Sequence, residues 1–204
     1  MKNWSELANN ESIAKTIESL KANGIDAMAV ENAQEAKEKA LELLGQNAEV
    51  MSMSSVTLDT TGISKEIQES GNYNSVNSKL AKMDRKTQGM EMQRLGAAPE
   101  YAVGSVHAVT EDGKVIIASN SGSQLPAYAY GAPHVLWVVG TQKIVKNVDQ
   151  GIKRIYEYVL PLESERVKKA YGMKRSNVSK MLIINKENAE GRLTLILVKE
   201  KLGF

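Results

Sequence analysis

The sequence predicts a single layered α/β domain over residues 1–204, with a largely parallel sheet and one antiparallel hairpin. Near the start of the chain, segments with apolar residues at helical spacing alternate with short apolar runs, as in parallel-sheet proteins. Two further apolar runs, 115–118 and 135–139, flank a short helical pattern over 123–130. The dipeptide Asp112-Gly113 favours a tight hairpin turn because both residues tolerate positive φ.

The first part of the chain supplies two helix–strand units. Residues 10–22, the helical part of an N-terminal segment over 1–22, carry Ile13, Ile17 and Leu20 on one face before a stop at Asn23-Gly24. Runs 25–30 and 49–53 are predicted strands, and 33–44 is the predicted helix between them. A further short helix is expected over 62–70.

The middle and end of the chain are less regular. Residues 72–78 are polar and weakly patterned, which predicts an exposed loop, and 79–95 form either one long helix or a broken pair. An amphipathic helix is expected over 147–158, separated by Pro161 from a second helix over 162–171. Runs 181–184 and 193–198 are predicted to pair antiparallel and close the domain.

Composition excludes several classes of protein. Apolar residues make up 42% and charged residues 25% of the chain, as in ordinary globular proteins, and the net charge of +2 gives no indication of nucleic-acid binding. The absence of cysteine excludes disulfides, cysteine nucleophiles and iron–sulfur ligation by this chain. No run resembles a signal peptide or a membrane span, so we expect a cytoplasmic protein.

A two-residue turn at 112–113 also sets the register of the hairpin. It places these residues opposite each other: Glu111 and Lys114, Val109 and Ile116, His107 and Ala118, and Ser105 and Asn120. Alternation then gathers Ser105, His107 and Asn120 on one face, beside the Ser/Gly loop that follows the second strand.

A ligand site is predicted where loops rich in hydroxyl residues follow the strands. In a right-handed parallel crossover, the loops after 115–118 and 135–139 share one sheet edge, and the loop after 49–53 joins them. The candidate ligand-binding residues are Ser54, Ser55, Asn120, Ser121, Gly122, Ser123, Gln124 and Lys143. Backbone N–H groups there suit a small anion and Lys143 adds a charge, although such loops also occur as plain helix caps.

Two residues are candidates for catalysis. His107 is a candidate general base, although a histidine on a half-buried strand is more often a hydrogen-bonded core residue. Glu111 is a candidate carboxylate, although it flanks the turn, where a cross-strand pair with Lys114 is the simpler role. His134, at a strand start, is expected to be structural. No histidine lies near an acidic pair at ligand spacing, so no metal site is predicted.

The region from 103 to about 162 resembles the LUD (lactate utilisation) domain family. The matching pieces are His107-Ala108-Val109-Thr110-Glu111-Asp112-Gly113, Tyr130-Gly131, Val138-Val139-Gly140, Lys143-Ile144-Val145 and the ending GRLTLILVKEKLGF. The resemblance implies a three-layer α/β/α fold of the NagB/RpiA/CoA transferase-like type and a role in organic-acid (lactate) utilisation. Many relatives carry an arginine where this chain has Gln124, and some carry a cysteine cluster in the region corresponding to about 163–180, where this chain has none.

Three functions follow as hypotheses. The first is a LUD-domain protein that binds a small anionic metabolite at the Ser/Gly loop. The second is a transferase or ligase of the wider superfamily acting on a phosphorylated or CoA-linked substrate, which would need a carboxylate on the ligand edge. The third is a non-catalytic subunit that docks an iron–sulfur partner protein. A homo-oligomer is a further expectation, whereas neither nucleic acid nor membrane is an expected partner.

Overall fold

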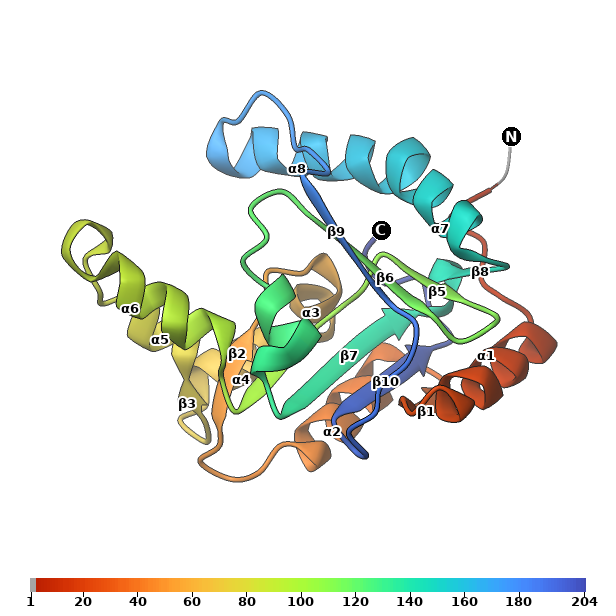
Figure 1. The fold of residues 1–204 in the computed structure, drawn as a ribbon, viewed down its shortest axis with the longest axis horizontal. Helices are drawn as coiled ribbons and strands as arrows, with labels where there is room; N and C mark the ends of the chain where they lie inside the picture. The colour runs from red at the N-terminus through yellow and green to blue at the C-terminus, as the bar shows by residue number, and fades with distance from the viewer. Residues whose placement is uncertain (1–2) are drawn as a thin grey trace.

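The computed structural model describes residues 3–204 and is built on a six-stranded sheet, whose arrangement can be followed in Figure 1. The sheet order is β1-β10-β7-β4-β2-β3, and every neighbouring pair is parallel. The strands are β1 Asp26–Val30, β2 Glu49–Ser52, β3 Asn74–Ser75, β4 Tyr101–Gly104, β7 His134–Gly140 and β10 Leu193–Val198. Met1 and Lys2 of the predicted N-terminal segment lie outside the described residues.

Two interior strands of the sheet, β7 and β10, are buried on both faces. Val135, Trp137 and Val139 of β7 pack into one hydrophobic cluster, whereas Leu136 and Val138 pack into another on the opposite face. Because both faces are covered, these strands read as continuous apolar runs rather than as an apolar–polar alternation.

Helices α2 Ala33–Leu43, α3 Val56–Thr61 and α4 Ile63–Glu69 cover one face of this sheet. The other face is covered by α1 Asn10–Ala22, a π-helix over Ala127–Gly131 and a smaller sheet. The predicted α/β fold, three-layered with a mostly parallel sheet and an antiparallel hairpin, is confirmed.

The smaller sheet has four strands in the order β8-β5-β6-β9. Its strands are β5 Ala108–Thr110, β6 Val115–Ser119, β8 Ile144–Val145 and β9 Lys180–Ile184. Helix α7 Val148–Arg154 packs against β5 and β6 and continues through a π-helical turn, Ile155–Val159, into α8 Leu160–Tyr171 (Figure 1). Pro161 does not separate two helices as predicted, since it lies in the first turn of α8, directly after the π-helical turn Ile155–Val159.

The predicted closing pair is wrong. Strand β9 pairs antiparallel with β6 in the small sheet, whereas β10 lies parallel between β1 and β7 in the large one. Both runs are strands, but an apolar run does not specify its partner. The interior position of β10, between β1 and β7, buries all but one of its six side chains, which an edge hairpin would have left half exposed.

The predicted exposed loop over 72–78 is also wrong in part. It contains the short strand β3 and the start of α5 Val76–Leu80, with Val76 fully buried. Ser75 caps α5 by accepting from the N–H of Ser78. The region over 79–95 is broken as one alternative foresaw, since α5 ends and α6 Arg85–Ala97 begins after a turn capped by Asp84.

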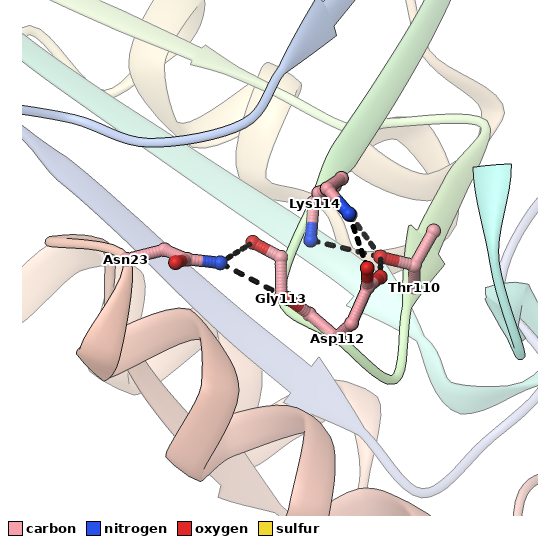
Figure 2. A network of polar contacts seen from close by, with 5 residues as sticks. All are labelled: Asn23, Thr110, Asp112, Gly113 and Lys114. Carbon is pink, nitrogen blue, oxygen red and sulfur yellow. Dashed lines mark hydrogen bonds and ion pairs between the residues drawn. The ribbon is translucent and has the colours of Figure 1, made fainter.

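The hairpin between β5 and β6 differs from its prediction by one residue. Val109 pairs with Val115 and Ala108 with Ile116, so the loop has three residues, 111–113, rather than two. Gly113 takes the left-handed conformation that closes such loops, with φ of 80°. The Asn23 side chain at the end of α1 donates to the carbonyls of Asp112 and Gly113 at 3.0 and 2.9 Å, tying the turn to α1 (Figure 2).

Candidate functional site

A cavity of about 560 Å³ opens among the loops that follow β2, β4 and β6, the turn after β7, and helix α8. Its polar lining includes Ser52, Ser54, Ser55, Thr57, Asp59, Asn77, Ser105, His107, Ser119, Asn120, Ser121, Ser123, Gln124, Lys143, Glu163 and Arg166. All predicted ligand-binding residues except Gly122 therefore line one cavity. They do not share one sheet edge, however, because β6 belongs to the small sheet and β7 to the large one.

The polar groups of the Ser/Gly loop form hydrogen bonds largely with one another. Ser119 Oγ donates to Gln124 Oε1 at 2.9 Å and accepts from the N–H of Gly122 at 2.8 Å, and Ser121 Oγ donates to Ser123 Oγ at 3.0 Å. Gly122 is needed for its left-handed φ of 87° and because a Cβ there would lie 2.6 Å from Lys180 Cδ. The loop therefore shapes one wall, and the structure supports its role as a turn more than as an anion cradle.

Ser54 and Ser55 form the wall after β2. Ser55 is the N-cap of α3, its Oγ accepting from the N–H of Leu58 at 3.5 Å. Ser52, the last residue of β2, is held by Asn77, whose amide oxygen accepts from both the N–H and the hydroxyl of Ser52. The capping role expected for this hydroxyl-rich turn is confirmed.

Lys143 is the most unusual group in the cavity. It lies in a 3₁₀ turn, Thr141–Lys143, that is anchored by a hydrogen bond of 2.9 Å from Gln142 Nε2 to the carbonyl of Leu202. Lys143 is 2% exposed, and its Nζ donates to Thr57 Oγ1 at 3.2 Å, Ser105 Oγ at 3.1 Å and the carbonyl of Val106 at 3.2 Å. Among the described residues, no carboxylate pairs with it.

The environment of Lys143 disfavours its charge. Burial, and secondarily the nearby positive charge of Arg154, lower the pKa of the Lys143 ammonium to about 7. An amine with this pKa exists in both protonation states at neutral pH, so it can bind an anion or accept a proton.

His107 is fixed by three hydrogen bonds. Its backbone N–H donates to the carbonyl of Ile116 at 3.0 Å, and its backbone carbonyl accepts from the Arg154 guanidinium at 2.7 Å. Its ring Nδ1 accepts from the backbone N–H of Ala118 at 3.1 Å. Burial, with Lys143 and Arg154 nearby, lowers the pKa of His107 to about 3. The ring is therefore neutral and carries its proton on Nε2, which makes it a hydrogen-bond donor rather than the predicted base.

Glu111 lies outside the cavity. It accepts from Ser12 Oγ at 2.7 Å and forms an ion pair of 3.1 Å with Lys15, both in α1, and these contacts lower its pKa. The predicted cross-strand pair of Glu111 with Lys114 is not formed, because Lys114 forms an ion pair with Asp112 across the three-residue loop instead (Figure 2). Glu111 thus ties the hairpin to α1.

Arg154 was not predicted as part of the site. It is fully buried in α7, donates to the His107 carbonyl and lies 5.2 Å from the ring of Tyr158, while its Nε and Nη2 have no partner among residues 3–204. Gly151, one turn earlier on the same face of α7, was a sequence signal that this face packs closely. A Cβ added at Gly151 would lie only 2.3 Å from Ile116 Cδ1. Ser105 and Thr57, the partners of Lys143, were also missed as site residues.

No three histidine or acidic side chains within the described part of the chain are grouped so that they could hold a metal ion. His134 is exposed at the start of β7 and stacks on Tyr101, with ring centroids 4.7 Å apart, as its structural interpretation expected. Over residues 3–204, no helix has the length and apolar character needed to span a membrane.

Comparisons with known proteins place the fold and the family. The chain is similar to the crystal structure of a DUF162 family protein from Deinococcus radiodurans, with a TM-score of 0.59 and 12% sequence identity over 95% of this chain and 99% of that chain. No curated protein matches the sequence. The family model described as the LUD domain matches residues 13–198, which include nearly the whole cavity lining. The chain therefore belongs to the LUD domain family.

Proposed function

We propose that this chain is a LUD-domain protein of the organic-acid (lactate) utilisation type, and that its cavity binds a small organic anion at Lys143. The observation that carries the proposal is a buried lysine that lines a polar cavity and has neutral oxygen atoms as its only partners among the described residues. A buried ammonium without a counter-ion is costly, and a bound carboxylate would offset that cost.

Other charges near the cavity support a ligand of this sign. Arg154 adds a second buried positive charge, which has no carboxylate partner among residues 3–204. Arg166, on the α8 wall, is bound by Glu163 at 2.7 and 2.8 Å, so that pair contributes little net charge. The neutral Nε2–H of His107 adds a donor that suits a carboxylate or hydroxyl oxygen.

The partner expectations are part of the same proposal. Because the chain has no cysteine, oxidation of a bound hydroxy acid through iron–sulfur clusters would need a partner protein that brings them. The transferase alternative gains no support from Glu111, which lies outside the cavity.

Isothermal titration calorimetry with L-lactate and pyruvate tests the proposal, with lactamide as a neutral analogue of the same shape. We expect both carboxylates to bind, lactamide not to bind, and Lys143→Met to weaken carboxylate binding by about tenfold or more, since charged hydrogen bonds contribute roughly 1.5–3 kcal/mol. Equal binding of lactate and lactamide, or unchanged binding by Lys143→Met, would show that Lys143 is not the anion-binding group.

A further inference from the structure

We propose that Ser105 and Lys143 form a nucleophile–base pair that hydrolyses esters or thioesters of small organic acids. The inference rests on the proposed function, because the acid released by such a reaction is the anion that the cavity binds. Serine–lysine pairs of this kind perform acyl transfer in hydrolases of unrelated folds, where the lysine replaces histidine as the base.

The hydrogen bonds around Lys143 orient its amine toward Ser105. The hydroxyl proton of Thr57 is committed to the carbonyl of Leu202, at 3.2 Å, so Thr57 Oγ1 can only accept from Nζ. The carbonyl of Val106 is likewise only an acceptor. A neutral amine donates its two protons to these atoms, and its lone pair then faces Ser105 Oγ at 3.1 Å.

Ser105 is placed to react. It follows directly after β4, lines the cavity, and is half-buried rather than sealed. Within the described residues its hydroxyl has no hydrogen-bond partner other than Lys143, so its proton is free to go to the amine. The nucleophile–base distance is within the range that general-base activation requires.

Burial, and then the charge of Arg154, favour a neutral amine at working pH. Arg154 of α7 and His107 before β5 are the charged and titratable side chains that interact electrostatically with Lys143. The other titratable side chains of the cavity are Asp59 of α3, Glu163, Arg166 and Tyr171 of α8, and Tyr128 of the π-helix. Burial and Arg154 together lower the pKa of Lys143 to about 7, as a general base needs. His107 supplies a neutral Nε2–H that suits the negative oxygen of a tetrahedral intermediate.

The reaction balances without a cofactor. Ser105 Oγ attacks the acyl carbon while Lys143 Nζ takes the hydroxyl proton, and the ammonium gives that proton to the departing alcohol or thiol as the carbon–leaving-group bond breaks. Water then attacks the acyl-serine with Lys143 again as base, and Ser105 recovers its proton as the acid leaves. Ester and water thus become acid and alcohol, or thioester and water become acid and thiol.

The cavity is larger than a three-carbon acid needs. At roughly 30 Å³ per small heavy group, a volume of about 560 Å³ holds on the order of twenty heavy atoms, whereas lactate has six. The remaining space suits the leaving group of an ester or thioester.

Labelling of the full chain with a fluorophosphonate, followed by peptide mass spectrometry, tests the pair. We expect one adduct, on Ser105, that forms faster as the pH rises through about 7. Ser105→Ala should abolish it, and Lys143→Met should slow it by about a hundredfold or more, as expected for loss of a general base. The exposed Ser70, outside the cavity, provides the matched control Ser70→Ala, which should label as the unmodified chain does.

An adduct that maps elsewhere, no adduct at all, or equal labelling of Lys143→Met would overturn the pair. The mapping and the pH profile use the unmodified chain, so they decide the matter even if a variant fails to fold. Lactate binding without labelling of Ser105 would reject the pair and keep the proposed anion site. Labelling of Ser105 without binding of any carboxylate would keep the pair and reject the proposed anion site.

Discussion

The Nδ1 atom of His107 accepts a hydrogen bond of 3.1 Å from the backbone N–H of Ala118. The imidazole thereby takes the place of a backbone acceptor just beyond the last paired residues of the β5–β6 ladder, Ala108 and Ile116. A proton on Nδ1 would oppose the N–H of Ala118 and break this bond, so the site holds His107 neutral with its proton on Nε2.

The first prediction concerns acid stability. Burial lowers the pKa of His107 to about 3, so between about pH 6.5 and about pH 3 the unfolded chain binds a proton that the folded chain does not. As the pH is lowered through this range, the free energy of unfolding should fall by up to about 1.4 kcal/mol per pH unit from this group alone. Urea unfolding over a pH series should show a shallower fall for His107→Gln than for the unmodified chain.

The other histidine provides the control for this effect. His134 is exposed and stacked on Tyr101, so His134→Gln should leave the acid profile parallel to that of the unmodified chain. Parallel profiles for His107→Gln and the unmodified chain would contradict a neutral His107.

The second prediction links anion binding to protons. Because the pKa of Lys143 is lowered to about 7 and a carboxylate binds the ammonium, binding above this pH should take up a proton. Lactate affinity should be constant well below pH 7 and fall by up to about tenfold per pH unit above it, until the pKa of the complex is reached. Calorimetry in two buffers of different ionisation enthalpy measures the uptake, which should approach one proton above pH 7. Binding without any proton uptake at alkaline pH would indicate that the anion contacts another group.

Part of the large sheet could be predicted from the chain because two of its strands, β7 and β10, are buried on both faces. The runs containing Val138 and Ile196 are nearly continuous apolar segments, which are typical of strands of a parallel sheet. Their order could not be predicted. The pattern around Ile196 is the same whether that strand closes an edge hairpin or lies between β1 and β7.

The candidate site could be predicted in composition but not in its centre. Ser54, Ser123 and Lys143 were expected near one another because hydroxyl-rich loops follow strands, and all three line the cavity. That the partners of Lys143 in the described part of the chain are neutral oxygen atoms depends on tertiary packing, which no local sequence pattern records. Arg154 was hidden for the same reason, since an arginine in an amphipathic helix is usually solvated.

The third prediction tests the packing that supports Ser105. A Cβ at Gly104 would lie 1.7 Å from Tyr128 Oη and 3.0 Å from Tyr128 Cζ, and Tyr128 is fully buried. Gly104→Ala should therefore lower the free energy of unfolding by about 1–3 kcal/mol through overpacking. The loss should be smaller in a Tyr128→Phe background, where the hydroxyl is absent.

Gly96 in α6 supplies the matched control for this substitution. No atom lies within 4 Å of a Cβ added there, so Gly96→Ala should stabilise the chain by up to about 1 kcal/mol through helix propensity. Equal losses from Gly104→Ala in both backgrounds would mean that the Tyr128 hydroxyl is not the obstacle.

The fourth prediction assigns Arg154 a positioning role. Its guanidinium touches neither the cavity nor Ser105, but it holds the His107 carbonyl at 2.7 Å and, after burial, is the second cause of the lowered pKa of Lys143. Removing the charge in Arg154→Met should raise that pKa. The pH above which lactate affinity falls should then move upward, and so should the pH at which labelling of Ser105 accelerates.

Arg154→Lys separates this electrostatic effect from a loss of packing, because it keeps the charge while changing the hydrogen bond. Its two pH midpoints should stay near those of the unmodified chain, even if its stability falls. A purely structural role would change the stability of both variants and leave both midpoints in place. An upward movement of the two midpoints together, in Arg154→Met alone, would instead identify Lys143 as the titrating group in both processes, because the other group they share, His107, has a pKa lowered to about 3 and stays neutral near pH 7.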